Sequence, residues 1–292
     1  MTLASRKTPP VESLGQGLPP PSRGRPHNGR PQGLPLLLRL CALAPILLSA
    51  CAASPTPTPT QTLTIFAASS LLGAFTEMGD SFESAHPAVS VALNFDGSQS
   101  LRAQIEQGAM ADVFASANAE EIEALAAQSL IATSQPFAAN SLIVILPSAN
   151  TAGIQSLADL ARPGLFLVLA ANDVPVGRYS RQALEKLNAQ FGADYSTRVL
   201  ANLVSDESNA KQIVAKVQLG EADAGIVYVS DSVAAPDLLT LAIPPEYNVT
   251  AEYPIAALAN APHPELAAEF IAFVLSADGQ SILEKWGFRP VK

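Results

Sequence analysis

The spacing of hydrophobic and polar residues changes between two periods along most of the chain, and it predicts alternating strands and helices. From Thr62 to Ala67 apolar and polar side chains alternate, which is typical of a strand. Beyond Ser69 and Ser70 the apolar residues recur at the spacing of one helix face, at Leu71, Leu72, Phe75, Met78 and Phe82. A predicted strand therefore runs into a predicted helix at two adjacent serines.

A second junction of the same kind follows in the first half of the chain. A strand predicted over 89–95 is followed by the turn Asp96-Gly97 and by a helix that starts near Ser98. Serine is a favoured helix N-cap, whereas free N–H groups at the positive end of a helix dipole suit an anion. Two interpretations are open here. Either the serines cap their helices and nothing binds, or hydroxyls and N–H groups together hold an anion.

The alternation continues toward the C-terminus. Further helices are predicted over 119–128, 156–161, 264–276 and 280–286, with two more after the loop 172–177 and after the polar segment 205–208. Further strands are predicted over 112–115, 140–147, 165–170, 199–202, 222–229, 238–243 and 253–259. Strands and helices in alternation favour an α/β fold with helices on both faces of the sheet.

The first 61 residues have a different composition, typical of export and anchoring. Residues 1–50 combine a long basic leader with a short apolar run after Arg39, as in a secretory signal. The run ends in Leu48-Ser49-Ala50-Cys51, which resembles the bacterial lipoprotein box, so Cys51 would become the lipidated first residue. Residues 51–61 then form a tether rich in proline and threonine. We expect an extracytoplasmic body anchored to the membrane through Cys51; the alternative is a plain signal peptide with an incidental cysteine.

Charge and motif content exclude several functions. Six of 17 basic residues and one of 26 acidic residues precede Cys51, which leaves 11 bases against 25 acids and a net charge of −14 for the rest. Such an acidic body argues against nucleic acid as a partner. The three histidines and two cysteines are too scattered for a metal site, and no nucleophile elbow or P-loop motif occurs. We therefore expect neither an enzyme nor a cofactor.

Five short motifs in order carry a resemblance to a known family. They are Phe66-Ala67-Ala68-Ser69-Ser70-Leu71, Val174-Pro175-Val176-Gly177-Arg178-Tyr179 and the segments 95–101, 108–117 and 220–228. By these motifs the body, residues 63–288, resembles the periplasmic molybdate-binding proteins of ABC importers. The resemblance implies an α/β fold of the two-lobed periplasmic binding protein class (type II), with two crossing hinge strands. Lobe 1 would comprise 62–141 and 252–292, and lobe 2 would comprise 142–251.

The resemblance also implies a binding site. In that family the oxyanion accepts hydrogen bonds from two serine hydroxyls, several backbone N–H groups and one tyrosine hydroxyl. The matching positions in this chain are Ser70, Ser98, Val176, Ala210 and Tyr228. Val176 and Ala210 would act through their backbone N–H groups. The implied ligand is molybdate or tungstate, which a monomeric receptor hands to an ABC permease in the membrane.

Other interpretations of the same residues are open. A site of donors only fits a fully deprotonated dianion, but the same fold could take sulfate, thiosulfate, phosphate or a small carboxylate. Tyr228 alone could be a core tyrosine, and Asp96 would have to point away from a bound anion. The basic side chains near the motifs are predicted to lie on solvated helix faces, at Arg178, Arg181 and Lys211.

Overall fold

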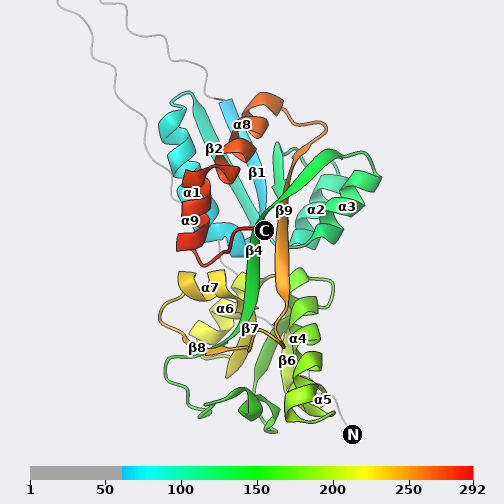
Figure 1. The fold of residues 1–292 in the computed structure, drawn as a ribbon, viewed down its shortest axis with the longest axis vertical. Coiled ribbons are helices and arrows are strands. Elements are labelled where there is room, and N and C mark those ends of the chain that lie inside the picture. Colours follow the sequence, from blue (N-terminus) through cyan, green and yellow to red (C-terminus); the bar gives the residue numbers. More distant parts are fainter. Residues whose placement is uncertain (1–60, 292) are drawn as a thin grey trace, which may run out of the picture. The chain divides into compact units, whose positions relative to one another are not determined.

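Two long strands, β4 (Ile131–Leu146) and β9 (Thr250–Leu258), run through the body in the computed structural model (Figure 1). The model describes residues 61–291, so the predicted signal segment 1–50, the lipidation site Cys51 and the tether up to residue 60 lie outside the described residues. β4 pairs with β9 as far as Ser141 and with β7 and β8 from Leu142 onward. We keep the names lobe 1 and lobe 2 for the two sides of this change, with boundaries that stay a prediction.

The sheet of lobe 1 contains the parallel strands β1 (Gln61–Ala68), β2 (Val89–Asp96) and β3 (Val113–Ala115), with β9 antiparallel to β3. Alternation along β1 sends Leu63 and Ile65 into one hydrophobic core and Phe66 into a second core on the opposite face. Helices cover both faces (Figure 1): α1 (Leu72–Ala85), α2 (Ser98–Glu106), α3 (Ala119–Ala127), α8 (Pro264–Leu275) and α9 (Ala277–Lys285).

Lobe 2 is built around the C-terminal end of β4, where the apolar run 142–146 pairs with β7 and β8. Its strands are β5 (Leu167–Ala170), β6 (Leu203–Glu207), β7 (Ala224–Tyr228) and β8 (Leu239–Ala242). Its helices are η2 (Leu157–Ala161), α4 (Pro175–Phe191), α5 (Tyr195–Leu200), α6 (Ala210–Gln218) and α7 (Val229–Ala234). β5 runs parallel to both β6 and β7, so the helices that connect these strands pack against the sheet.

The strand order in the described residues is β2-β1-β3-β9-β4-β7-β5-β6, with β8 paired to β4. The parallel strands of each lobe end toward the region where the lobes meet, and the next helices begin there (Figure 1). This arrangement confirms the predicted α/β class. It also directs several helix N-termini to one region, as expected at the carboxyl ends of parallel strands.

The structure contradicts the sequence prediction at three places. Residues 199–202, predicted as a strand, are the end of α5 and a turn, whereas the segment 205–208, predicted as polar loop, lies largely in the edge strand β6. β4 begins at Ile131 rather than near 140, because its exposed first part carries polar residues such as Ser134 and Gln135 and two register shifts. Polar edge strands lack the continuous apolar run that identifies a central strand.

The closing helices α8 and α9 bury apolar side chains against the core of lobe 1, among them Phe270, Val274 and Leu283. Within residues 61–291 no single helix has the length and hydrophobicity of a membrane span. α8 and α9 reach those values only as a pair that is bent by 63°.

Candidate functional site

The five residues that the resemblance implied as ligands line one small cavity between the lobes. Ser70 and Ser98 come from lobe 1, and Val176, Ala210 and Tyr228 come from lobe 2. The empty space between the walls of this cavity, including its open side, is about 210 Å³. The rest of its wall consists of Ala68, Ser69, Asp96, Gly97, Ala117, Val174, Pro175 and Asn209. The structure thus brings all five predicted residues together.

Helix N-termini surround this cavity. Ser69 begins the short helix η1 (Ser69–Leu71), which leads into α1, and Ser98 is the first residue of α2. Val176 is the second residue of α4, Ala210 is the first of α6, and Tyr228 directly precedes α7. The first N–H groups of a helix have no partner within it and carry the positive end of its dipole. The cavity wall is therefore rich in hydrogen-bond donors.

Neither Ser70 nor Ser98 is a helix cap. No side-chain hydrogen bond caps η1, α1 or α2. Ser70 Oγ lies 2.9 Å from Tyr253 Oη, and Ser98 Oγ accepts a hydrogen bond from the Ala117 N–H at 3.0 Å. Among the described residues the Ser98 proton has no acceptor, so it is free to be donated into the cavity. The interpretation that these serines serve only as caps is wrong.

Tyr228 supplies a hydroxyl group without a protein partner. Its side chain is 2% exposed, and its Oη atom forms no hydrogen bond within residues 61–291. Burial raises the pKa of the Tyr228 phenol well above its usual value, and the neighbouring Tyr253, Tyr179 and Asp231 raise the pKa further. The hydroxyl therefore stays protonated and can donate. A buried polar group left unsatisfied costs about 1–3 kcal/mol, which a ligand acceptor would offset.

Asp96 lies in the cavity wall, whereas the sequence analysis expected it to point away from an anion. Its Oδ1 atom accepts hydrogen bonds from the Gly97 N–H and from Asn209 Nδ2, each at 2.8 Å. Asn209 is also the N-cap of α6, since its Oδ1 atom accepts from the Gln212 N–H at 3.1 Å. One amide thus caps a helix of lobe 2 and binds a carboxylate of lobe 1. Two donors on Asp96 offset part of the repulsion that its charge would exert on an anion.

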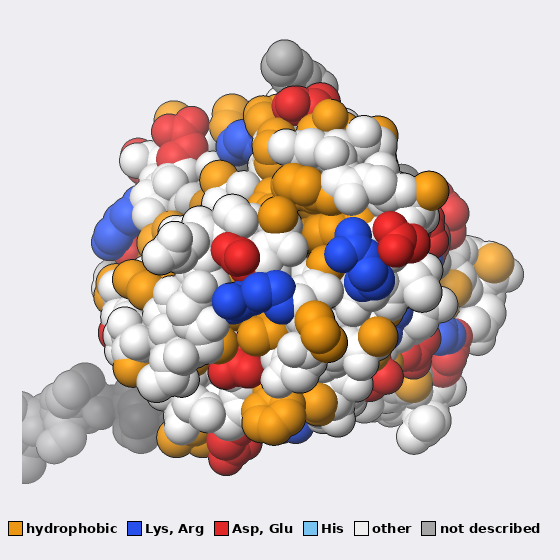
Figure 2. Space-filling view, turned by 90° about the horizontal axis from the view of Figure 1, so that it is seen from below, with side chains coloured by type: hydrophobic (Ala, Val, Ile, Leu, Met, Phe, Trp, Pro, Cys, Tyr) orange, Lys and Arg blue, Asp and Glu red, His pale blue; other side chains and the backbone are white. Residues whose placement is uncertain are grey.

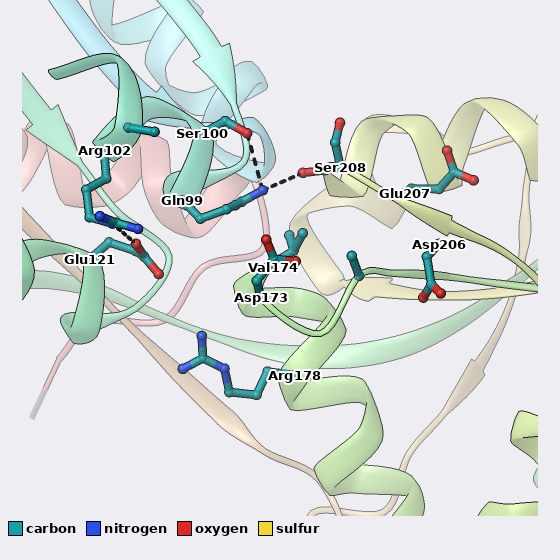
Figure 3. A pocket seen from close by; sticks show the side chains of 12 residues that line it. Gln99, Ser100, Arg102, Glu121, Asp173, Val174, Arg178, Asp206, Glu207 and Ser208 are labelled. Carbon is teal, nitrogen blue, oxygen red and sulfur yellow. Dashed lines mark hydrogen bonds and ion pairs between the residues drawn. The ribbon is translucent and has the colours of Figure 1, made fainter. Parts of the chain in front are cut away.

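The lobes meet closely beside the cavity. Gln99 Nε2 donates to the Ser208 carbonyl at 3.0 Å, and Arg178 forms an ion pair with Glu120 of α3. Figure 3 shows Gln99, Arg178 and Ser208 around a neighbouring hollow. This hollow has a volume of about 660 Å³, and its lining carries more acidic than basic side chains. These contacts connect α2 and α3 of lobe 1 with α4 and Ser208 of lobe 2. They therefore hold the cleft in a closed form.

The basic side chains near the site are largely committed to other partners. Arg178 pairs with Glu120, and Arg181 donates to the Ala170 carbonyl at 2.7 Å and to Asp206 at 2.6 Å. Both arginine side chains are partly exposed and form ion pairs, whereas Lys211 is exposed as predicted. Figure 2, which views the molecule from below, shows basic and acidic side chains next to each other rather than one broad basic patch.

A buried carboxylate supports the cavity from behind Tyr228. Asp231 is 5% exposed, and its Oδ2 atom accepts from the Tyr228 N–H at 3.0 Å. Burial raises the pKa of Asp231 to about 7, although the Tyr228 N–H and the charge of Lys211 act in the opposite direction. Asp231 does not line the cavity.

In the part of the chain that is described, no group of three His, Cys, Asp or Glu side chains is placed to hold a metal ion.

A cleft between two lobes, lined by helix N-termini, defines an extracellular binding protein of transport systems. In agreement, residues 63–289 match the family described as bacterial extracellular solute-binding protein, and the chain belongs to this family. The predicted family resemblance and the two-lobed fold class are thereby confirmed.

Individual relatives narrow the comparison. The molybdate-binding protein ModA of Mycobacterium tuberculosis is 37% identical over 228 residues, which cover 77% of this chain and 84% of that protein. YvgL of Bacillus subtilis, whose name places it among ABC transporter substrate-binding lipoproteins, is 27% identical over 233 residues, with coverage of 77% and 85%. The periplasmic molybdate-binding protein of Azotobacter vinelandii has a similar fold, with a TM-score of 0.70, 19% identity, and coverage of 79% of this chain and 100% of that one.

Two contributors to the site were missed by the sequence analysis. Tyr253 lies in an alternating strand, where a tyrosine is indistinguishable from a core residue. Asn209 precedes a helix, where an asparagine is an ordinary N-cap. Their partners, Ser70 and Asp96, lie 183 and 113 residues away, so only the folded structure reveals these contacts.

Proposed function

We propose that this chain is the substrate-binding component of an ABC importer and that its cavity holds molybdate. The observation that carries the proposal is the set of donors around one cavity between the lobes, and above all the buried Tyr228 hydroxyl without a protein acceptor. The identity to ModA over most of both chains supports molybdate as the ligand. Ser70, Ser98 and Tyr228 would donate through hydroxyls, and Val176 and Ala210 through backbone N–H groups.

The chemistry of the cavity wall suits a dianion without ionisable protons. Its one carboxylate, that of Asp96, accepts from the Gly97 N–H and from Asn209 through the same oxygen, Oδ1. A protonated phosphate would need an acceptor, so the comparison of molybdate with phosphate tests whether Asp96 serves as one. Removing water from a dianion costs several kcal/mol, and fixed neutral donors can offset that cost because hydrogen bonds to a charged group are roughly twice as strong as neutral ones. Tungstate has the same charge and shape and is included in the proposal, with sulfate as the alternative of equal charge and smaller size.

We further propose that Cys51 carries a lipid and that the receptor works as a monomer beside its membrane permease. The lipoprotein-like motif at Cys51 and the lipoprotein name of one relative support the anchor. β1 begins at Gln61, so the folded body would start ten residues after the lipid. Intact-mass analysis of the protein from membrane extracts tests the anchor, because a mature chain without added lipid mass contradicts it.

Thermal unfolding with different oxyanions tests the ligand. Residues 56–292, which form one compact unit, are heated with molybdate, tungstate, sulfate or phosphate at millimolar concentration. A ligand present at a thousand times its Kd stabilises the folded state by about 4 kcal/mol. We expect the midpoint to rise with molybdate and tungstate only. A rise with sulfate alone would assign the site to the alternative, and no rise with any oxyanion would refute the proposal.

Ser98→Ala tests the cavity residues. Because the substitution removes a hydrogen bond to a charged ligand, worth about 1.5–3 kcal/mol, we expect roughly a 10- to 150-fold weaker molybdate affinity by calorimetry. Ser84→Ala is the matched control, since Ser84 lies in helix α1 of the same lobe, outside the cavity wall, and its hydroxyl donates only to the Asp80 carbonyl of its own helix. Equal affinities of the two variants would remove Ser98 from the site.

A further inference from the structure

Tyr253 contacts the cavity only through two wall residues, Ser70 and Tyr228. It lies in β9, its side chain is 0% exposed, and it is not part of the cavity wall. Its Oη atom is 2.9 Å from Ser70 Oγ, and both groups are buried. One of these two hydroxyl groups therefore donates its proton to the other.

The direction of this hydrogen bond decides what Ser70 presents to the cavity. A serine hydroxyl has one proton and two lone pairs. If Ser70 donates to Tyr253, only lone pairs remain for the cavity, and these repel an anion. If Tyr253 donates to Ser70, the serine proton is free to point toward the anion. The same hydroxyl can thus favour or oppose binding, depending on its partner.

The surroundings of Tyr253 fix its ring and keep its proton. The ring packs edge-on against Tyr228, Phe137 and Phe288, with centroid distances of 5.6, 6.4 and 5.3 Å. Burial raises the pKa of the Tyr253 phenol well above its usual value, and the charge of Asp231 adds to this effect, although the side chains of Ser70, Asn140 and Tyr228 lower the pKa somewhat. Its hydroxyl therefore keeps its proton and is held at one position.

We propose that Tyr253 is a positioning residue for anion binding, whose hydroxyl donates to Ser70 Oγ and directs the Ser70 proton into the cavity. The inference rests on the proposed function of this cavity. Tyr253 also joins the two sides of the cleft, since its ring contacts Tyr228 of lobe 2 while its hydroxyl contacts Ser70 of lobe 1. Two tyrosines then serve the anion in different ways: Tyr228 donates to it directly, and Tyr253 orients another donor.

The test is a double-mutant cycle in the mature chain, with molybdate affinity measured by calorimetry. Tyr253→Phe is expected to weaken binding about tenfold, which corresponds to about 1.4 kcal/mol. In a Ser70→Ala background the same substitution is expected to cause no further loss, because there is no serine proton left to orient. A purely structural role predicts instead that the two effects add. Unchanged affinity of Tyr253→Phe, or additive effects, would overturn the inference.

A second variant tests the direction of the hydrogen bond. It also keeps the inference testable if Tyr253→Phe does not fold. Replacing Tyr253 with p-aminophenylalanine keeps a donor at the position of the hydroxyl but supplies a poor acceptor. We expect this variant to bind within about twofold of the wild type, and a loss as large as that of Tyr253→Phe would contradict the inference. Tyr195→Phe is the control, since the Tyr195 hydroxyl donates to the Leu157 carbonyl at 2.5 Å, outside the cavity wall.

The two hypotheses can fail separately. A wild-type protein that binds sulfate but not molybdate refutes the proposed ligand, and the same cycle with sulfate then tests Tyr253. If the wild type and Tyr253→Phe bind molybdate with the same affinity, only the role of Tyr253 is refuted, and the proposed ligand stands. Binding of no oxyanion at all refutes both.

Discussion

The contact between Asn209 and Asp96 gives the sharpest test of closure, through the substitution Asn209→Asp. Aspartate is as good an N-cap as asparagine, so the start of α6 should be preserved. The amide donor to Asp96 Oδ1, now at 2.8 Å, is lost, and a second carboxylate takes its place. The substitution therefore acts on the junction of the lobes and leaves the helix intact.

The size of the effect follows from the geometry. Two unit charges about 4 Å apart repel by about 4 kcal/mol at an effective dielectric constant near 20. Asp96 and Asn209 are both partly exposed, so solvent screening lowers this to about 1–2 kcal/mol. Loss of the hydrogen bond to a charged group adds about 1.5 kcal/mol or more. These costs apply only to the closed form, and the new carboxylate in the cavity wall would also repel the dianion directly, so molybdate affinity should fall by roughly 50-fold or more.

Calorimetry of Asn209→Asp beside Asn209→Ser separates repulsion from the lost hydrogen bond. Serine also caps helices and removes the amide without adding charge, so its affinity loss should be about tenfold. Because salt screens exposed charges, the gap between the two variants should narrow between low salt and 0.5 M salt, where the Debye length is about 4 Å. Equal affinities of the two variants, or a gap that does not respond to salt, would refute the reasoning.

Two further substitutions test closure and burial. Gly97→Ala should weaken molybdate affinity in calorimetry, because an added Cβ would lie 2.5 Å from the Ser208 carbonyl across the cleft. The melting midpoint of the ligand-free protein should not fall, and a lower midpoint would contradict this prediction. Asp231→Asn should raise the free energy of unfolding at pH 8 but not at pH 3.5. Burial raises the pKa of Asp231 from 3.8 to about 7, so wild-type stability falls as pH rises through that range, by at most about 4 kcal/mol. Urea melts at several pH values check this, and the same pH slope in both proteins contradicts it.

Regular, buried elements were the part of the fold that could be predicted from sequence. The strand predicted over 89–95 is β2 (Val89–Asp96), and the helix predicted over 119–128 is α3 (Ala119–Ala127). Both have a clear period because one face is buried. The four residues 199–202 are too few to show a period, and a short apolar run fits a helix end as well as a strand. β6 was missed since its alternate residues face solvent at an edge of the sheet.

The site was predictable to a different depth for each residue. The serine junctions alone indicated Ser98 and the pair Ser69 and Ser70. The choice of Ser70 within that pair, and the positions Val176, Ala210 and Tyr228, came only from the family resemblance. Asn209 and Tyr253 had no signal in the sequence. The role of Asn209 depends on Asp96 in the other lobe, and the role of Tyr253 depends on Ser70 in the cavity wall. Sequence patterns report which face of an element is buried, and they do not report which distant group that face meets.

The absence of basic residues from the cavity wall has a consequence for release. A lysine in the wall would attract an anion to one lobe even with the cleft open, because its charge acts over several ångströms. Neutral donors act only at hydrogen-bond distance, and this cavity takes them from both lobes. Opening the cleft would remove the donors at Val176, Ala210 and Tyr228 together, so affinity would fall steeply with a small movement. Contacts such as Asn209 with Asp96, which join the two lobes at the cavity wall, then influence how readily the bound ion is given up.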